Sequence, residues 1–221
     1  MLVVFPLGFD EKFIVRALIR NKLKKEDKLL AILPEGYEKE ERTITALKNL
    51  QGLLKSLTSE DSITVVEVPL GSGEDMVLTI RKEVLRHLTP DREILAVLSG
   101  GMRALTVTTL AALSSLQDVS VRVESDFENL AGFISFDLTP ILAPADIRWV
   151  RILCGIYRGK SIRKTAEEIG TSPATVSREL QRMMHYNLVR PVRAITQVVR
   201  YEITDGGMFY LKLYGDDCIE V

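Results

Sequence analysis

Two glycine-bearing loops hold the residue types that could bind a phosphate or a nucleobase. The first loop, residues 6–10, reads Pro-Leu-Gly-Phe-Asp, and the second, residues 99–103, reads Ser-Gly-Gly-Met-Arg. Glycines let backbone amides approach a phosphate closely, a helix N-terminus carries positive potential, and arginine offers a planar fork for a phosphate. We therefore predict a nucleotide site at these loops, with a plain strand-to-helix turn as the alternative for the second loop.

Other common chemistries lack their motifs in this chain. Neither loop matches the dinucleotide fingerprint or the phosphate-binding P-loop, and residues 71–75, which come closest, have acidic residues and no lysine. His87 and His185 lie far in sequence from the loops and from any acidic cluster with metal-ligand spacing. We predict no catalytic residue, no metal site, and no cofactor such as NAD or ATP.

A second chemistry, DNA binding, is indicated by residues 161–180. Ser161 is a good helix N-cap, and Gly170 readily adopts the tight turn that ends a short helix. Ser172-Pro173 then combines an N-cap with proline at the first position of the next helix. This order resembles the helix-turn-helix of bacterial and archaeal regulators, with the later helix as the recognition helix.

The side chains expected to contact DNA come from this motif and from the segment after it. Residues 188–194 and 198–203 predict the two strands of a basic hairpin, which we call the wing. Side chains near the start of a recognition helix reach base edges, whereas other basic residues contact phosphates. The predicted contacts are Arg163, Lys164, Thr171, Ser172, Ala174, Thr175, Ser177, Arg178, Arg182, Arg190, Arg193 and Arg200. A purely structural three-helix module is the alternative.

The elements that must position the two loops alternate between short strands and longer helices. Strands are predicted over residues 2–5, 28–33, 62–68, 93–98 and 120–124, with 132–138 as a candidate sixth. Amphipathic helices are predicted over residues 11–23, 39–57, 74–88 and 102–116. The alternation predicts a doubly wound, Rossmann-like α/β domain with a parallel sheet, in which ligands bind beyond the carboxyl ends of the strands.

Two prolines near residue 142 end this alternation and indicate a domain boundary. We predict a Rossmann-like ligand-sensing domain over residues 1–143 and a winged helix-turn-helix domain over residues 144–221, opening with a helix over 145–158. Residues 1–143 contain 17 basic and 21 acidic residues, whereas residues 144–212 contain 12 basic and 6 acidic residues. A basic segment on an otherwise acidic chain suits a polyanion such as DNA. A solvated basic face is the alternative.

The composition is that of an ordinary globular protein. Hydrophobic residues make up 46% and charged residues 27% of the chain, which favours a sizeable core over disorder. The apolar stretches fall short of the ~18 residues of a membrane span and no basic leader opens the chain, so we predict a cytoplasmic protein. Cys154 and Cys218 are too few for a disulfide framework, and we expect one buried thiol and one incidental thiol.

The two loops and the DNA-binding motif together resemble a known family. Over essentially the whole chain, the order of these features is similar to the CRISPR-associated Rossmann-fold (CARF) transcriptional regulators. The resemblance implies a homodimer that binds a cyclic oligoadenylate, with tetra-adenylate fitting the two-fold symmetry, and that regulates CRISPR-associated genes in antiviral defence. It implies ligand-binding roles for Leu7, Gly8, Phe9, Asp10, Ser99, Gly100, Gly101, Met102, Arg103 and Thr106.

Two other functions fit the same residues. Some relatives of such sensors cleave the cyclic ligand, and positioning alone can make a bound 2′-hydroxyl attack its own phosphate, so a slow ring nuclease is one alternative. A metabolite-sensing regulator is the other, and it would need a closed pocket within one subunit. Phe9 fits either stacking on adenine or a place in the core.

Overall fold

The computed structural model divides the chain into two compact units, Met1–Phe136 and Asp137–Val221. The structure describes residues 1–55, 63–194, 197–215 and 218, and the side chains of these residues except those of 193, 194 and 197–199. Residues 56, 57 and 62, at the ends of a predicted helix and a predicted strand, lie outside the described part. Among the described residues, no helix combines the length and apolarity that a membrane span requires.

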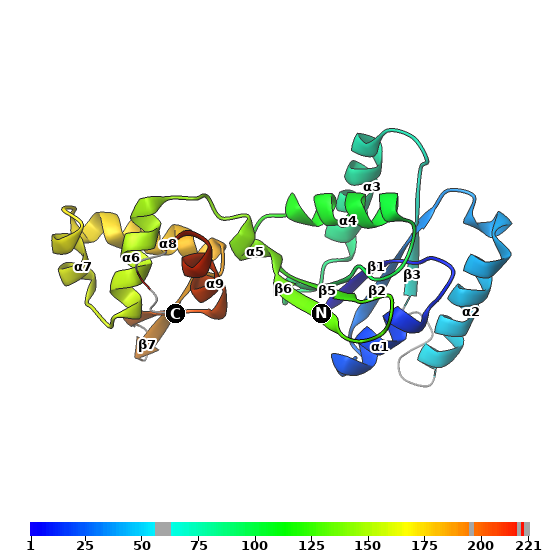
Figure 1. Cartoon of the computed structure of the whole chain (residues 1–221), viewed down its shortest axis with the longest axis horizontal. Helices are drawn as coiled ribbons and strands as arrows, with labels where there is room; N and C mark the ends of the chain where they lie inside the picture. The colour runs from blue at the N-terminus through cyan, green and yellow to red at the C-terminus, as the bar shows by residue number, and fades with distance from the viewer. Residues whose placement is uncertain (56–62, 195–196, 216–217, 219–221) are drawn as a thin grey trace. The chain divides into compact units, whose positions relative to one another are not determined.

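The first unit is a six-stranded sheet with helices on both faces. Its strands are β1 (Leu2–Pro6), β2 (Lys28–Pro34), β3 (Ile63–Val68), β4 (Glu93–Val97), β5 (Ser120–Asp126) and β6 (Phe133–Asp137). Its helices are α1 (Lys12–Arg20), the 3-10 turn η1 (Tyr37–Lys39), α2 (Glu41–Lys55), α3 (Gly73–His87) and α4 (Arg103–Ser114). Helices α1 and α2 cover one face of the sheet, and α3 and α4 cover the other (Figure 1). The predicted strands and helices are confirmed, with ends that differ by a few residues.

The order of the strands brings β1 and β4 together at the centre of the sheet. The order is β3-β2-β1-β4-β5-β6, and neighbouring strands from β3 to β5 pair in parallel. The chain runs outward from β1 to β3 and then returns to β4 on the other side of β1, so the direction of winding reverses there. Because parallel strands end at the same edge of a sheet, the loops after β1 and β4 emerge next to each other.

The core of the first unit explains its near-continuous apolar strands. All residues of β1 are buried, because helices pack on both faces of the sheet. On the face covered by α1 and α2, Val3 and Phe5 pack with Ile14 of α1 and Leu50 of α2. Burying one large apolar side chain stabilises the fold by about 1.5–3 kcal/mol. This core therefore fixes the positions of the strands from which the two loops emerge.

The second unit contains the predicted helix-turn-helix and hairpin. Its elements are α5 (Leu138–Ile141), α6 (Ile147–Tyr157), α7 (Ile162–Glu168), α8 (Pro173–His185), β7 (Val189–Ala194), β8 (Gln197–Ile203) and α9 (Asp205–Tyr214). Strands β7 and β8 pair antiparallel. Helix α9 has no counterpart among the predicted elements, because Gly206 and Gly207 in its first turn weaken the helical pattern.

The division between the units falls before α5, several residues earlier than residues 143 and 144. Leu138 and Pro140 of α5 are buried. A Cβ atom on Gly206 of α9 would lie 2.6 Å from Pro140 Cγ, so α5 and α9 pack without space for a side chain between them. The segment with the prolines is therefore a packed part of the second unit rather than a connection.

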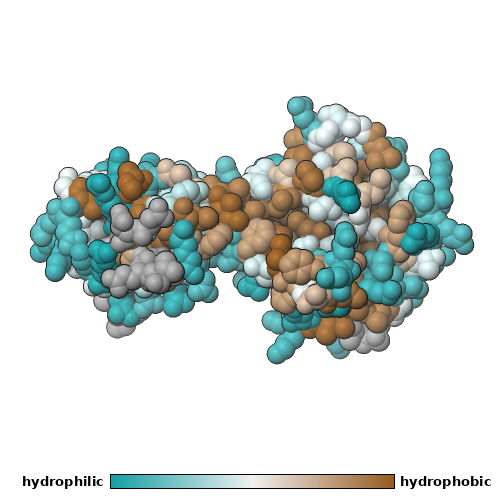
Figure 2. Space-filling view, viewed as in Figure 1, coloured by the Kyte–Doolittle hydropathy of each residue, from teal (hydrophilic) through white to brown (hydrophobic). Residues whose placement is uncertain are grey.

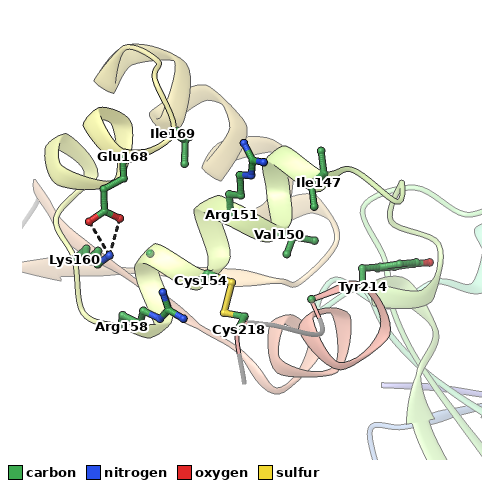
Figure 3. A pocket seen from close by; sticks show the side chains of 12 residues that line it. Ile147, Val150, Arg151, Cys154, Arg158, Lys160, Glu168, Ile169, Tyr214 and Cys218 are labelled. Atoms are coloured by element: carbon green, nitrogen blue, oxygen red, sulfur yellow. Dashed lines mark hydrogen bonds and ion pairs between the residues drawn. A yellow bond between two sulfur atoms is a disulfide. The ribbon is translucent and has the colours of Figure 1, made fainter. Parts of the chain in front are cut away.

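Cys154 and Cys218 form a disulfide, so the expectation of two separate thiols is wrong. Their Cα atoms lie 5.7 Å apart, although 64 residues separate them in sequence. Figure 3 shows the bond joining α6 to the segment that follows α9. The packing of α9 against α6 brings the two cysteines together, and spacing in the sequence alone does not reveal this packing.

Candidate functional sites

The two glycine loops meet through their backbones. A Cβ atom on Gly8 would lie 2.9 Å from the Cα and N atoms of Gly101, which leaves no space for any side chain. Gly101 itself has a φ of +81°, and its own Cβ would lie 2.7 Å from Pro6 Cβ. A Cβ on Gly100 would lie 3.1 Å from the Pro6 carbonyl oxygen. Glycine at these positions is thus what lets the loops after β1 and β4 form one continuous backbone surface.

The first loop divides its side chains between the core and the surface. Leu7 is 1% exposed and belongs to the core, so its predicted contact with a ligand is not supported for the side chain. Its N–H donates to the Ile32 carbonyl at 3.0 Å, which continues the β1–β2 pairing and turns the side chain inward. Phe9 is 53% exposed, which settles its place in favour of the surface. Asp10 accepts a hydrogen bond from the Lys12 N–H, at the first residue of α1, at 2.9 Å.

The second loop is held in shape by hydroxyl groups of the loop and of α4. Ser99 Oγ accepts a hydrogen bond from the Asp126 N–H at 2.8 Å, and Thr106 Oγ1 donates to the Gly100 carbonyl at 3.2 Å. These contacts indicate that both residues position the loop. Met102 is half exposed at the N-cap of α4, and its side chain accepts no hydrogen bond from the helix. Arg103 is exposed at the first position of α4 and has no ion-pair partner in the part of the chain that the structure describes.

A buried ion-pair network stands behind the second loop. The Asp126 carboxylate is fully buried and pairs with Arg16 at 3.3 Å and with Arg20 at 3.1 Å. Arg20 also pairs with the buried Glu124 at 2.8 Å, and Asn21 donates to the same carboxylate at 3.1 Å. Since the Asp126 N–H binds Ser99, the network ties the loop to α1 and β5. Buried carboxylates require such partners, because an unpaired buried charge is costly.

The helix-turn-helix has the predicted caps. Ser161 Oγ accepts from the Lys164 N–H at 3.2 Å, and Ser172 Oγ accepts from the Thr175 N–H at 3.1 Å. Gly170, with a φ of +68°, forms the turn between α7 and α8. Each cap contributes about 1 kcal/mol, so the local sequence stabilises the angle at which α8 leaves the turn.

A buried carboxylate anchors the recognition helix α8 to α6. Glu179 is 8% exposed and accepts a hydrogen bond from Trp149 Nε1 at 2.9 Å. Arg182 lies 3.3 Å from the same carboxylate, on the exposed side. Sequence patterns did not indicate this role for Glu179, because a charged residue on a helix usually faces water. The contact partly neutralises the charge of Arg182. Arg178, one turn earlier, is exposed and has no ion-pair partner among the described residues.

The predicted DNA contacts lie mostly on the surface of the second unit. Hydrophilic residues cover much of the visible face of this unit (Figure 2). Thr171, Thr175 and Ser177 are half-buried, and the side chain of Arg193 lies outside the described part of the chain. The exposed candidates are Arg163, Lys164, Ser172, Ala174, Arg178, Arg182, Arg190 and Arg200. These positions come from α7, α8 and the wing, as the motif requires.

One carboxylate binds both described arginines of the wing. Glu202 lies 3.1 Å from Arg190 and 2.7 Å from Arg200. The hydrogen bond from Arg190, reinforced by that from Arg200, holds the pKa of Glu202 below its ordinary value. Glu202 was absent from the predicted site, although a cross-strand pairing of Arg190 with Glu202 is the signal that could have found it. The wing therefore presents less free positive charge than its sequence indicates.

Replacing Glu202 with glutamine is expected to tighten binding to a random-sequence DNA duplex by about two- to fivefold at low salt, because exposed ion pairs are weak and their arginines exchange readily for another anion. Both arginines become available to phosphates, so the dependence of affinity on salt should steepen. Fluorescence anisotropy at several salt concentrations measures both quantities. Glu167→Gln removes an equal charge from α7 without releasing an arginine. Equal gains for the two variants would contradict the pairing argument.

Comparisons with known proteins identify both parts of the chain. The family model of the Csa3 CRISPR-associated Rossmann-like domain matches residues 1–137, and the model of a helix-turn-helix domain matches residues 150–183. No curated protein matches this chain.

Two solved structures are similar to the chain at low identity. Protein VC1899 from Vibrio cholerae shares 13% identity at a TM-score of 0.47, over 87% of this chain and 53% of its own. Can2 from Sulfobacillus thermosulfidooxidans, solved in complex with cyclic tetra-adenylate, shares 11% identity at a TM-score of 0.41, over 95% of this chain and 62% of its own. The chain thus spans less than two thirds of either structure.

The resemblance noted from the two loops and the helix-turn-helix is confirmed by these family matches, because their order along the chain is the same. The Csa3 match covers residues 1–137 of 221, which is more than half of the sequence. The chain therefore belongs to the Csa3 family of CRISPR-associated Rossmann-like proteins, and a helix-turn-helix domain follows its Rossmann-like domain.

Proposed function

We propose that this protein is a transcriptional regulator of CRISPR-associated genes that binds a cyclic oligoadenylate, of which tetra-adenylate fits best, across a homodimer. The observation that carries the proposal is the direct contact between Gly8 and Gly101. It places the N-terminus of α4, which the side chain of its N-cap residue Met102 does not cap, and the exposed Arg103 next to the first loop. Backbone amides, a helix N-terminus and a guanidinium together suit the phosphates of a nucleotide ring.

A calorimetric titration with cyclic tetra-adenylate tests the sensor half of the proposal. We expect one ligand for two chains and a roughly tenfold weaker affinity for Arg103→Ala, because a charge-assisted hydrogen bond to phosphate contributes about 1.5–3 kcal/mol. Linear tetra-adenylate serves as the ligand control, and Arg151→Ala removes an exposed arginine from α6 in the other unit. Tight binding that Arg103→Ala leaves unchanged would place the ligand elsewhere.

The chemical fate of the ring is checked in the same samples. We propose that the protein binds the ring without cleaving it, and chromatography after prolonged incubation should recover intact cyclic tetra-adenylate. Linear products that accumulate in proportion to the protein would instead support the ring nuclease. A dimer that binds a small metabolite in place of the ring would show no heat with either adenylate.

The DNA half of the proposal depends on α8 and the wing. Replacing Arg178 with alanine is expected to weaken specific DNA binding about tenfold, because a contact to a base edge or phosphate contributes ~1–3 kcal/mol. Anisotropy with duplexes selected from a random library measures the loss. Arg81→Ala, on α3 of the first unit, is the control variant. An unchanged affinity for Arg178→Ala would remove α8 from the interface.

Regulation requires that the ligand bind two arrangements of the dimer with different affinity. We propose that the ring changes the spacing or mobility of the two recognition helices. Operator affinity measured with and without saturating cyclic tetra-adenylate tests this coupling directly. Identical affinities would end the coupling proposal and leave both binding sites in place.

A further inference from the structure

The Cys154–Cys218 disulfide forms part of the wall of a cavity of about 450 Å³ in the second unit. Apolar side chains of α6, of α9 and of the residue that ends α7 line the same cavity. Its volume lies within the range of about 300–1,000 Å³ found for small-molecule sites. Cys154 is partly exposed, whereas Cys218 is 7% exposed. Because accessible disulfides are the ones that exchange with thiols, this bond is a candidate for such an exchange.

Two arginines flank Cys154 on one face of α6. Arg151 lies three residues before it, and Arg158, the C-cap residue, lies four residues after it. Residues at these separations are neighbours on a helix, with about 5–6 Å between their Cβ atoms. Both arginines are exposed, line the cavity and have no ion-pair partner among the residues that the structure describes. Figure 3 shows the three side chains on successive turns, so Cys154 stands between two guanidiniums that are free to bind an anion.

The rest of the cavity does not cancel this positive charge. Glu168 is the one acidic residue among the described residues of the lining, and its carboxylate lies 2.6 Å from Lys160 Nζ. The hydrogen bond from Lys160 holds the pKa of Glu168 below its ordinary value, so the carboxylate stays ionised and paired. This pair contributes no net charge, and the two arginines leave an excess of positive charge. The excess attracts small anions over about 10 Å at about 0.1 M salt.

This face of α6 is turned away from the recognition helix. Trp149 donates a hydrogen bond to Glu179 of α8 at 2.9 Å, so its side of α6 packs against α8. With about 3.6 residues in each turn, Arg151 lies about 200° and Cys154 about 140° around the helix from Trp149. A small molecule can therefore reach Cys154 in the folded protein while the contact between Trp149 and Glu179 stays in place.

We propose that Cys154 is a site of reversible S-thiolation by small thiols that carry a carboxylate. The thiolate sulfur of the small molecule attacks Cys154 Sγ and forms a new S–S bond, while the bond to Cys218 breaks and its electron pair leaves on Cys218 Sγ. The carboxylate of the bound thiol pairs with Arg151 and Arg158. Attack by the released Cys218 thiolate on Cys154 Sγ reverses the step and returns the small thiol.

The attacked sulfur is that of Cys154 rather than that of Cys218. Cys218 is the more buried of the two, and aspartates precede it in the sequence at residues 216 and 217, so their charge disfavours an anionic thiol next to it. The inference goes beyond the proposed function and does not depend on it, because neither the cyclic ligand nor DNA takes part in the exchange.

The first experiment treats the full chain with three thiols of similar size, of which mercaptopropionate is anionic, mercaptoethanol neutral and mercaptoethylamine cationic. Acid quenching and mass spectrometry give the rate of exchange, and each rate is divided by that of the same thiol with hydroxyethyl disulfide, which removes differences in intrinsic reactivity. We expect mercaptopropionate to react about five- to tenfold faster than mercaptoethylamine at low salt, and the ratio to fall below about two in ~1 M salt. Peptide mapping should place the mercaptopropionate adduct on Cys154.

The second experiment uses the paired variant Arg151→Ala with Arg158→Ala. The preference for mercaptopropionate over mercaptoethylamine should fall below about twofold, because the charges that attract the carboxylate are gone. Arg148→Ala, exposed on α6 and outside the lining of the cavity, is the matched control and should keep the wild-type preference. Thermal melts confirm that each variant folds, and the salt dependence of the wild type tests the same charges without any substitution.

Four results would overturn the proposal. Equal rates for the three thiols would show that the arginines do not assist the exchange. A preference that persists in the paired variant would place its cause elsewhere, and an adduct on Cys218 would contradict the assigned point of attack. A bond that none of the thiols opens below the temperature of unfolding would be purely structural.

Discussion

Reduction of the Cys154–Cys218 disulfide is expected to lower the free energy of unfolding of the second unit by about 4 kcal/mol, from the entropy of a closed loop of this length. The bond encloses a span of 64 residues that includes α7, α8, the wing and α9, so it restricts the unfolded form of the whole DNA-binding region. For a unit of this size, a loss of that magnitude corresponds to a fall of roughly 15–30 °C in the midpoint of thermal unfolding.

Thermal unfolding with and without a phosphine reductant measures this effect. The paired variant Cys154→Ser with Cys218→Ser should unfold at the lower temperature under both conditions and should show no response to the reductant. The first unit contains no cysteine and serves as an internal reference, because both cysteines belong to the second unit. A wild-type protein whose transitions are identical with and without reductant would refute the expected contribution of the bond.

Replacing Gly101 with alanine is expected to separate the two glycine loops, at a cost of about 2–5 kcal/mol in stability. The methyl group meets Pro6 Cβ at 2.7 Å and the Pro6 carbonyl carbon at 3.0 Å, and the φ of +81° disfavours any side chain. A left-handed conformation costs about 1–2 kcal/mol and overpacking about 1–3 kcal/mol. Because the surface shared with Gly8 is lost, affinity for cyclic tetra-adenylate should fall at least tenfold.

Calorimetry and urea unfolding of the same variant check both parts of this expectation. Gly71→Ala is the matched control, since nothing lies within 4 Å of a Cβ at that position and its φ is not in the left-handed range. Its stability and affinity should equal those of the wild type. If Gly101→Ala keeps full stability and affinity, the close approach of the two loops contributes neither to folding nor to ligand binding.

Local patterns were sufficient for most elements of both units, with α9 as an exception. The strands β1 and β4 could be predicted because they are buried on two faces. A strand of that kind is a short, continuous run of apolar residues, which can be recognised without knowing what packs against it. The ends of α7 and α8 could be predicted because Ser161, Gly170 and Ser172 act on backbone groups only a few residues away. The order of these elements was enough to indicate a Rossmann-like fold followed by a helix-turn-helix.

The tertiary structure alone decided which side chains face each other across long sequence separations. Gly8 and Gly101 meet because β1 and β4 are neighbours in the sheet, and Leu7 turns inward while Phe9 turns outward because the β1–β2 pairing continues one residue past β1. Arg42 of α2 lies over Phe9 because α2 packs on the same face of the sheet as α1, the helix that follows the first loop.

The pairing of Cys154 with Cys218 likewise depends on how α9 packs against α6, and the neutralisation of the wing by Glu202 depends on strand register. A sequence specifies local hydrogen bonds and periodicity over a few residues, so the caps and strands of this protein could be predicted from it. Contacts between distant residues follow from the summed packing of many side chains, and only the folded chain determines them.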